Sequence, residues 1–390
     1  MLLAGFVDET AWFLPSGTLE SFRADLGLTY AQAGTVLALV GPGALLGTVF
    51  AAMADRYSRR VIASGGAFAF AACMAAFAAG GSFLVLALAS LAMGAAATAM
   101  VDGCEVALVD MVGEDELRPA LARWNLFGVF GDLAGPALVA GAAFAGFSWR
   151  ASFWVVTALL LAYGAALAAS PLPAPSSAKA AEEEDEDEKR GSFRTMLAVA
   201  RDRRVWIIGG IGLLSGPFDE TLLGFTIALL ETKRGASAGA ATLVALIGLC
   251  GGLVAYTGLA KRFEAVPENR LLVWASAAMT VGVVGIAVLP WTPLVALAAF
   301  TTNVALSLAW LAIQHRTLSL RPGQVGTTKA VLAVIEFPDF LLPIAIGAVA
   351  DQSGLVAAIG LYSVLGAGLV SLALASARAD RRARARGRAG

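Results

Sequence analysis

Residues 5–10 read Gly-Phe-Val-Asp-Glu-Thr and residues 216–221 read Gly-Pro-Phe-Asp-Glu-Thr, so a closely similar hexapeptide recurs 211 positions along the chain. A second pair recurs at almost the same distance, because residues 132–136 and 339–343 both begin with Asp and end with Pro, 207 positions apart. One such match could arise by chance in a chain rich in few residue types. Two matches at nearly one offset indicate an internal duplication, so the sequence predicts two related halves.

The composition is that of a membrane protein. Of the 390 residues, 58% are hydrophobic and 15% are charged, and the mean hydropathy is +0.76. Soluble domains are about 45–50% apolar and about 25% charged. A membrane-spanning helix needs about 20 mostly apolar residues, so the chain has room for roughly a dozen. Because Asp8 and Glu9 stand where the apolar core of a signal peptide would lie, we expect the first span to be retained.

Charge clusters and Pro/Gly turns divide the sequence into twelve candidate spans. The N-terminal six, within residues 1–170, are 1–21, 31–54, 61–80, 83–110, 120–146 and 150–170. The C-terminal six, within residues 205–377, are 205–230, 238–260, 271–289, 293–314, 325–350 and 355–377. Residues 171–204 contain a run of seven acids and are expected to be a disordered cytoplasmic linker; residues 378–390 form a basic tail. We therefore expect an all-α membrane protein of twelve transmembrane helices in two pseudo-symmetric six-helix bundles.

The distribution of Lys and Arg predicts the orientation, since these residues accumulate on the cytoplasmic side. With both termini on one side, 24 of the 28 Lys and Arg residues lie on that side, and only Arg23, Arg150, Lys233 and Arg234 lie on the other. We expect a multi-pass protein of the cell inner membrane with both termini in the cytoplasm. The Arg-rich tail is then expected to contact anionic membrane lipids and not nucleic acid.

Nine acidic residues fall inside the predicted spans and away from the last two residues of each span, where a charge costs about 2.5–3.5 kcal/mol to insert. They are confined to the first, fourth, fifth, seventh and eleventh spans: Asp8, Glu9, Asp102, Glu105, Asp132, Asp219, Glu220, Glu336 and Asp339. The third, sixth, ninth and twelfth spans carry none in their apolar cores, as expected for lipid-facing helices. We predict that these carboxylates face a shared polar interior and bind protons or substrate there.

Spacing adds detail to this prediction. Asp102 and Glu105, like Glu336 and Asp339, are three residues apart and share a helix face. Two neighbouring carboxylates in a low-dielectric setting cannot both ionise easily, so each pair can take up and release a proton. A pair can equally bind a cation. The alternative for any one acid is a permanently protonated side chain that only accepts hydrogen bonds from neighbouring helices.

The charge balance of the spans favours some substrates over others. No Lys or Arg lies near the middle of a predicted span, and the only histidine, His315, ends the tenth. An anionic substrate would therefore meet unneutralised acids, so we expect a cationic or neutral lipophilic one. Trp12 and Trp310 lie in stretches that could line the interior, where either could stack on a flat cation or simply pack.

The loop between the second and third spans, residues 51–60, reads Ala-Ala-Met-Ala-Asp-Arg-Tyr-Ser-Arg-Arg. It resembles the signature loop of the major facilitator superfamily, Gly-x-x-x-Asp-Arg-x-Gly-Arg-Arg, with Ala and Ser at the two glycine positions. The resemblance implies that Asp55, Arg56 and Arg60 latch the cytoplasmic side during conformational switching. The alternative is a basic loop that only fixes topology.

A second resemblance lies in the fifth span, where residues 128–141 read Gly-x-x-Gly-Asp-x-x-Gly-Pro-x-x-x-x-Gly. This is similar to the Gly/Pro motif of the drug:proton antiporters of that superfamily, in which a glycine pair usually follows the proline sooner. Glycines permit close helix approach, and we expect Gly135 and Pro136 to bend the helix. Ser90 stands four residues before Gly94, where the antiporters tend to carry an arginine, so proton transfer is left to the carboxylates.

The residues and the resemblance together predict a proton-coupled antiporter that exports a cationic or neutral lipophilic molecule by alternating access. Asp8, Glu9, Asp219 and Glu220 are assigned to proton or substrate contact. The relay is assigned to Asp132, Glu336 and Asp339, with Asp102 and Glu105 in support. No Gly-x-x-x-x-Gly-Lys-Ser/Thr loop is present for ATP, and we expect a monomer without cofactor or bound metal.

Two other functions stay open. One is proton-coupled uptake of a small cation, a metal or a polyamine, although a single His and three Cys without paired spacing disfavour a transition metal. The other is a sensor or enzyme built on the same fold. An enzyme would need a nucleophile and base, or a metal-ligand cluster, which one histidine at a helix end does not supply. A sensor would usually need an output domain.

Overall fold

The computed structural model describes residues 1–53, 58–112, 114–170, 196–263, 266–320 and 325–387. Within these ranges the regular secondary structure is helical and contains no strand, so the predicted all-α architecture is confirmed. By length and composition, eleven helical stretches among them could cross a membrane. The first helix, α1 (Leu3–Gly17), has 15 residues, falls short of that length, and is followed directly by α2 (Leu19–Leu26). With α1 included, the count agrees with the predicted twelve.

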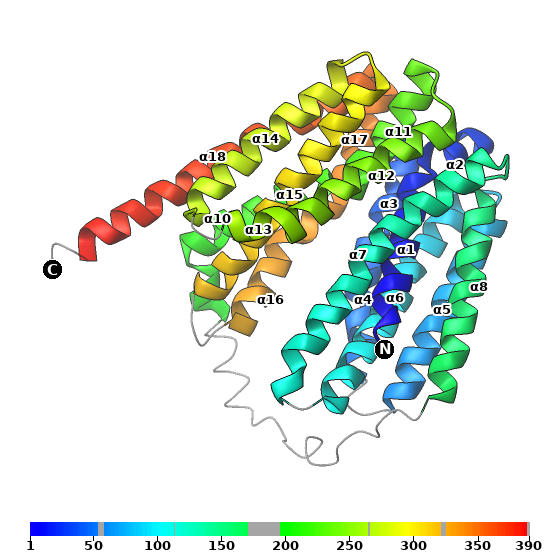
Figure 1. The fold of residues 1–390 in the computed structure, drawn as a ribbon, viewed down its shortest axis with the longest axis horizontal. Helices are drawn as coiled ribbons and strands as arrows, with labels where there is room; N and C mark the ends of the chain where they lie inside the picture. Colours follow the sequence, from blue (N-terminus) through cyan, green and yellow to red (C-terminus); the bar gives the residue numbers. More distant parts are fainter. Residues whose placement is uncertain (54–57, 113, 171–195, 264–265, 321–324, 388–390) are drawn as a thin grey trace. The chain divides into compact units, whose positions relative to one another are not determined.

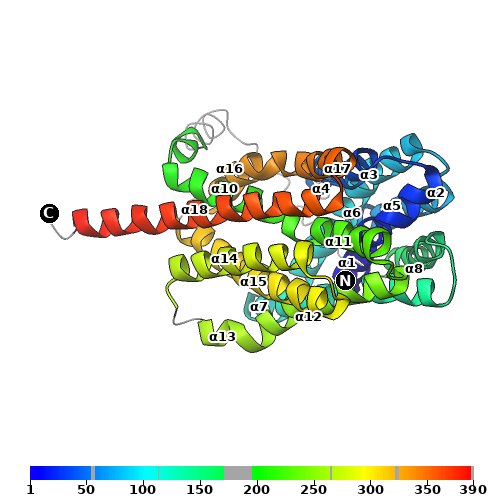
Figure 2. The same cartoon turned by 90° about the horizontal axis from the view of Figure 1, so that it is seen from above.

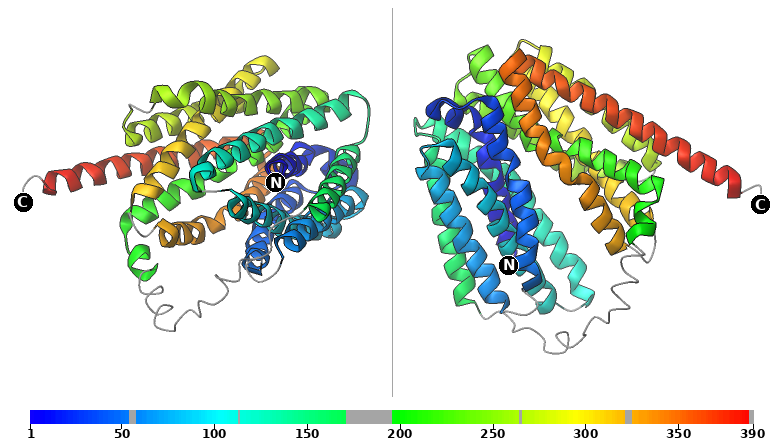
Figure 3. Two further views of the ribbon diagram at one scale, coloured as in Figure 1. Left: turned by 60° about the horizontal axis from the view of Figure 1, so that its bottom comes forward. Right: turned by 180° about the vertical axis from the view of Figure 1, so that it is seen from behind.

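The chain divides into two compact units. Of the described residues, the first unit takes in those within 1–170, 227–246 and 343–351, and the second unit takes in the others. The N-terminal helices of the first unit are α1, α2, α3 (Tyr30–Ala38), α4 (Val40–Met53), α5 (Arg59–Ala79), α6 (Phe83–Met111), α7 (Glu114–Phe144) and α8 (Arg150–Ala169). Within it α1 packs along α7, α4 packs on α6, and α5 packs against both α6 and α8 (Figures 1 and 3).

An aromatic cluster and an ion pair stabilise one end of the first unit. The rings of Phe77 and Phe153 stack with centroids 4.5 Å apart, and Phe22 meets Phe77 edge to face at 5.7 Å. Next to them Arg150, the first residue of α8, forms an ion pair with Asp25 at the end of α2. Hydrogen bonding to this guanidinium lowers the pKa of the Asp25 carboxyl. These contacts tie α2, α5 and α8 together.

The first unit also contains segments from the second half of the chain. They are the end of α11 (Glu220–Arg234), the start of α12 (Ala238–Val254) and most of α17 (Leu341–Ser353). At α17, both carboxylate oxygens of Asp351 accept hydrogen bonds of 2.8 Å from the backbone N–H groups of Tyr30 and Ala31. These N–H groups open α3, where the helix dipole favours a negative charge. Asp351 therefore caps a helix more than 300 residues away in sequence.

The remaining helices form the second unit. They are α10 (Arg203–Ser215), α13 (Ala260–Phe263), α14 (Glu268–Val288), α15 (Thr292–Leu320), α16 (Val325–Glu336) and α18 (Leu355–Gly387), together with the first part of α11 and the last part of α12. In this unit α14 packs between α15 and α18, and α10 packs on α16 and α18 (Figure 2). The last helix, α18, continues past the predicted end of the span at residue 377.

Three of the predicted spans contain short turns that are not α-helical, a detail that the sequence analysis did not give. A 3-10 turn at Gly216–Phe218 separates α10 from α11, and another at Phe337–Phe340 separates α16 from α17. Each turn contains a proline, Pro217 or Pro338, which cannot donate the backbone hydrogen bond of a continuing helix. A π-helical turn at Ala255–Leu259 follows α12. In membrane proteins such breaks are tolerated where the backbone is buried in protein or lines a water-filled cavity.

Candidate functional site

In the first unit, the predicted acids of the first span lie where α1 crosses α7 closely. A Cβ atom added to Gly131 would lie 2.5 Å from the Phe6 carbonyl oxygen and 2.9 Å from the Glu9 Cβ, so this crossing requires glycine. A Cβ atom added to Gly128 would lie 3.7 Å from Glu9 Cγ, which is an ordinary van der Waals contact. The half-buried Glu9 side chain thus lies over the glycine face of α7.

The neighbouring acid, Asp8, extends this group of charges from α1 toward α6. Its carboxylate accepts a 3.0 Å hydrogen bond from the Trp12 indole, a neutral donor. Asp8 lies within electrostatic range of Glu9 and of Asp102 on α6, and Asp102 is in turn within range of Glu105. The structure therefore brings four of the predicted acids together in the first unit. Asp102 is half-buried there, whereas Glu105 is exposed.

In the second unit, the helix breaks position three of the predicted acids. Asp219 directly follows the 3-10 turn after α10, and Glu336 is the last residue of α16. Asp339 lies inside the next 3-10 turn. Asp219 is exposed and has no ion-pair partner among the described residues, while Glu336 and Asp339 are half-buried and within electrostatic range of each other. The sequence predicted the pairing of Glu336 with Asp339, but not the breaks.

In the second unit, too, the acid side chains pack against glycines. A Cβ atom added to Gly212 of α10 would lie 2.0 Å from Glu336 Oε1, and one added to Gly216 would lie 3.1 Å from Asp339 Oδ2. Two acids, at the end of α16 and in the 3-10 turn after it, thus lie over two glycines four residues apart on α10 and its following turn. The same arrangement of a carboxylate over glycines of a partner helix occurs at Glu9, so each unit contains one such crossing.

A cavity of about 370 Å³ in the second unit includes one of these acids. It is lined by Trp310, Ile313, Gln314, Thr317, Leu332, Ala333 and Glu336. In this lining Glu336 is the charged residue and Trp310 is the large aromatic residue. The volume of the cavity lies within the range of about 300–1,000 Å³ that is usual for small-molecule sites. Trp310 is one of the two tryptophans that the sequence placed in possible cavity-lining stretches.

The other predicted residues are placed as follows. Asp132 is half-buried one position after Gly131, and Glu220 is half-buried at the start of α11. Gly135 faces α1, since a Cβ there would lie 2.8 Å from Phe13 Cβ. α7 remains one helix through Pro136. Of the predicted latch, Asp55 and Arg56 lie outside the described residues, and Arg60 is half-buried in α5.

Three acids that the sequence analysis did not single out stand at the ends of helices. Glu20 on α2 pairs with Arg23 at 2.6 Å and accepts a 2.9 Å hydrogen bond from the Tyr30 hydroxyl. Glu231 lies in the last turn of α11, and Asp351 caps α3. Glu231 and Asp351 each lie one residue beyond a predicted span end, so a boundary error removed them from consideration. A signal existed for Asp351, because Gly347-x-x-x-Asp351 has the spacing of the loop motif at 51–60.

Comparison with known proteins assigns a family to this arrangement. A family model described as Major Facilitator Superfamily matches residues 1–337. No curated protein sequence matches the chain.

Solved structures agree on the fold. The chain resembles the nucleoside transporter NupG with a TM-score of 0.75 at 14% identity, covering 97% of both chains. A D-xylose-proton symporter gives 0.74 at 16%, covering 96% of this chain and 95% of that one. An inward-facing, occupied bacterial homologue of the human lysosomal transporter Spinster gives 0.70 at 16%, covering 97% and 96%. Likenesses at this identity establish the fold alone.

Proposed function

Because the chain belongs to the Major Facilitator Superfamily, and is therefore a multi-pass secondary transporter and not an enzyme, we propose that it exchanges protons for an organic cation. Of the cationic and neutral lipophilic molecules expected from the sequence, the cationic ones are the substrates, exported by alternating access. The observation that carries the proposal is that Glu336 and Trp310 line one cavity.

The lining of this cavity supports a cationic substrate. A tryptophan face attracts a cation through its ring quadrupole, by about 0.5–2 kcal/mol depending on desolvation. The Glu336 carboxylate in the same lining supplies the counter-charge, and no Lys, Arg or His is among the residues that line the cavity. An anionic substrate would meet repulsion from Glu336 without a compensating cation. A flat aromatic cation satisfies both groups at once.

Proton coupling is supported by the position of the acids at interrupted helices. Asp219 and Asp339 lie at 3-10 turns that interrupt the regular α-helices. In transporters of several folds, discontinuous helices of this kind form substrate and ion sites. A carboxylate that exchanges a proton for a cation at such a site couples the two fluxes, because the two ligands compete for one negative charge. In this account Asp8, Glu9 and Glu220 share that role, while Asp132 takes part in the relay with Asp102 and Glu105.

Uptake of a small cation, such as a metal or polyamine, is the second candidate. A metal is disfavoured because no group of three His, Cys, Asp or Glu side chains suited to a metal ion occurs among the described residues. A polyamine would use the same carboxylates but would gain little from Trp310. We further propose a monomer in the inner membrane, with both termini in the cytoplasm and the basic tail against anionic lipid.

Binding of a fluorescent flat cation to purified full-length protein tests the site. We expect ethidium to bind with a fluorescence increase, and Glu336→Gln to weaken binding by about tenfold, because a charge-assisted contact is lost. Trp310→Leu should weaken binding several-fold and Trp310→Phe less, since Phe keeps a weaker π-face. Trp274→Leu is the matched control, because Trp274 is an exposed tryptophan of α14. Unchanged binding by both Glu336→Gln and Trp310→Leu would contradict the proposal.

A further inference from the structure

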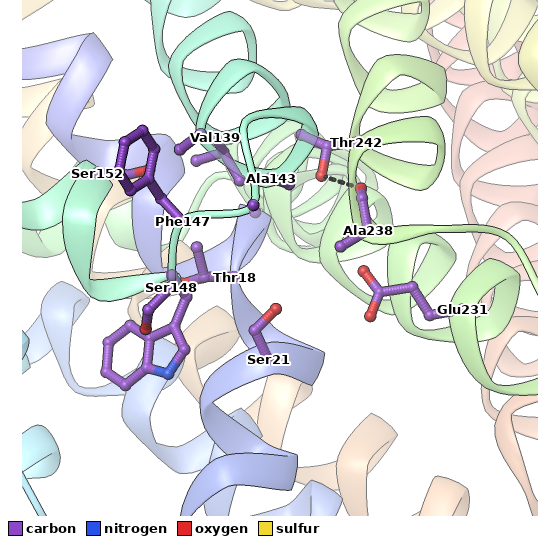
Figure 4. A pocket seen from close by; sticks show the side chains of 14 residues that line it. Thr18, Ser21, Val139, Ala143, Phe147, Ser148, Ser152, Glu231, Ala238 and Thr242 are labelled. Atoms are coloured by element: carbon purple, nitrogen blue, oxygen red, sulfur yellow. Dashed lines mark hydrogen bonds between the residues drawn. The ribbon is translucent and has the colours of Figure 1, made fainter.

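A second cavity lies entirely within the first unit. Its volume is about 180 Å³, and its walls come from the α1–α2 junction, the end of α7 with the turn into α8, and the segment from α11 to α12 (Figure 4). The residues used below are Thr18, Ser21, Ser152, Glu231 and Thr242, all of which line it. None of them belongs to the transport site proposed above.

The charge of this cavity comes from Glu231. It is the charged residue in the lining, and Figure 4 shows its carboxylate extending from α11 toward the side where Thr18 and Ser21 lie. Glu20 lies within electrostatic range of Glu231 but is already bound to Arg23 and Tyr30. The cavity thus presents a negative charge without a basic side chain in its own walls.

The hydroxyl groups in the walls of this cavity offer hydrogen-bond acceptors to a ligand. Thr18 donates its proton to the Leu14 carbonyl at 2.7 Å, and Thr242 donates to the Ala238 carbonyl at 2.9 Å. Each hydroxyl therefore has only lone pairs left for a ligand. Walls that combine such lone pairs with a carboxylate suit a ligand with several N–H donors.

Ser152 gives an independent indication that the cavity holds a polar ligand. Its side chain is 1% exposed, and its hydroxyl has no hydrogen-bond partner among the described residues. Buried polar groups are nearly always hydrogen-bonded, so one that lines a cavity without a protein partner is normally satisfied by what the cavity holds. A ligand donor or a bridging water would satisfy it.

Together these features point to an ammonium group, and we propose that the cavity binds the ammonium end of a small primary amine with Glu231 as counter-ion. The inference rests on the proposed function in that it assigns a second binding position to a cationic substrate. The volume corresponds to about six water molecules at about 30 Å³ each, which admits an amine of a few carbon atoms. A Ca²⁺ ion would need about six to eight oxygen ligands, and the walls supply a single carboxylate.

Equilibrium binding of n-propylammonium to the full-length protein in nanodiscs tests the assignment by isothermal titration. We expect saturable binding that Glu231→Gln weakens at least about tenfold and Ser152→Ala weakens a few-fold. Glu268→Gln is the matched control, because Glu268 lies at the start of α14 in the second unit and does not line the cavity. Binding that is absent, or that is unchanged in both Glu231→Gln and Ser152→Ala, overturns the site.

The variant Glu336→Gln separates this proposal from the transport proposal. We expect Glu336→Gln to weaken ethidium binding about tenfold but to keep propylammonium binding unchanged, since Glu336 is not part of this cavity. If ethidium binding never depends on Glu336 while propylammonium binding still depends on Glu231, the transport site is wrong and the amine site stands. If ethidium binding depends on Glu336 while propylammonium binding does not depend on Glu231, only the amine site is wrong.

Discussion

A single methyl group at position 131 would lie 2.5 Å from the Phe6 carbonyl oxygen, closer than real Cβ contacts allow. The acids of this protein are positioned by such glycines, because Glu9 lies over Gly131 and Glu336 lies over Gly212. The sequence singles out the acids as an unusual set, since charge inside an apolar span is costly. It could not predict which glycine each acid contacts, because that depends on how the helices cross.

Substituting Gly131 tests this packing. We expect Gly131→Ala to destabilise the protein by about 1–3 kcal/mol, because overpacking forces α1 away from α7. Gly141→Ala is the matched control on the same helix, where an added Cβ meets nothing within 4 Å and Ala favours the helix by about 0.5–1 kcal/mol over Gly. Thermal unfolding in detergent measures both variants. A Gly131→Ala protein as stable as Gly141→Ala would show that the crossing is not tight.

At the scale of the element, the interruptions of the helices were the part that could not be predicted. The apolar run at 205–230 is long enough for one span, and a proline such as Pro217 can equally bend a helix or end it. The outcome depends on tertiary partners for the released backbone groups, which a single sequence does not name. For the same reason the ends of the spans were uncertain, and Glu231 and Asp351 were missed by one residue each.

The cap of α3 by Asp351 gives a prediction at this scale. Asp351→Asn removes the negative charge from the helix N-terminus and at least one of two acceptors. We expect the amide hydrogens of Tyr30 and Ala31 to exchange about fivefold faster, the effect of losing roughly 1 kcal/mol of capping. Gln352→Ala, at the exposed neighbouring residue, is the control. Equal exchange rates in the two variants would mean that the cap contributes nothing to the start of α3.

At the scale of the whole molecule, the composition, the repeated hexapeptide and the loop at 51–60 were sufficient to predict an all-α transporter fold of this superfamily, and the family match confirms it. These features are global, so errors at single residues do not affect them. Prediction of the substrate class, by contrast, depends on local structure, namely on which side chains share a cavity. Trp310 and Glu336 are 26 positions apart in sequence and meet only through the packing of α15 against α16.

The central claim is that carboxylates at interrupted helices exchange protons for an organic cation. Proton release from inside-out vesicles with an imposed proton gradient, acid inside, tests it most directly. Addition of ethidium outside should release protons from vesicles containing the unchanged protein, and Asp219→Asn should abolish the release while the variant remains folded and inserted. Release that is absent for ethidium and for a broad panel of cations and neutral lipophiles, or that is undiminished in Asp219→Asn, would contradict the account.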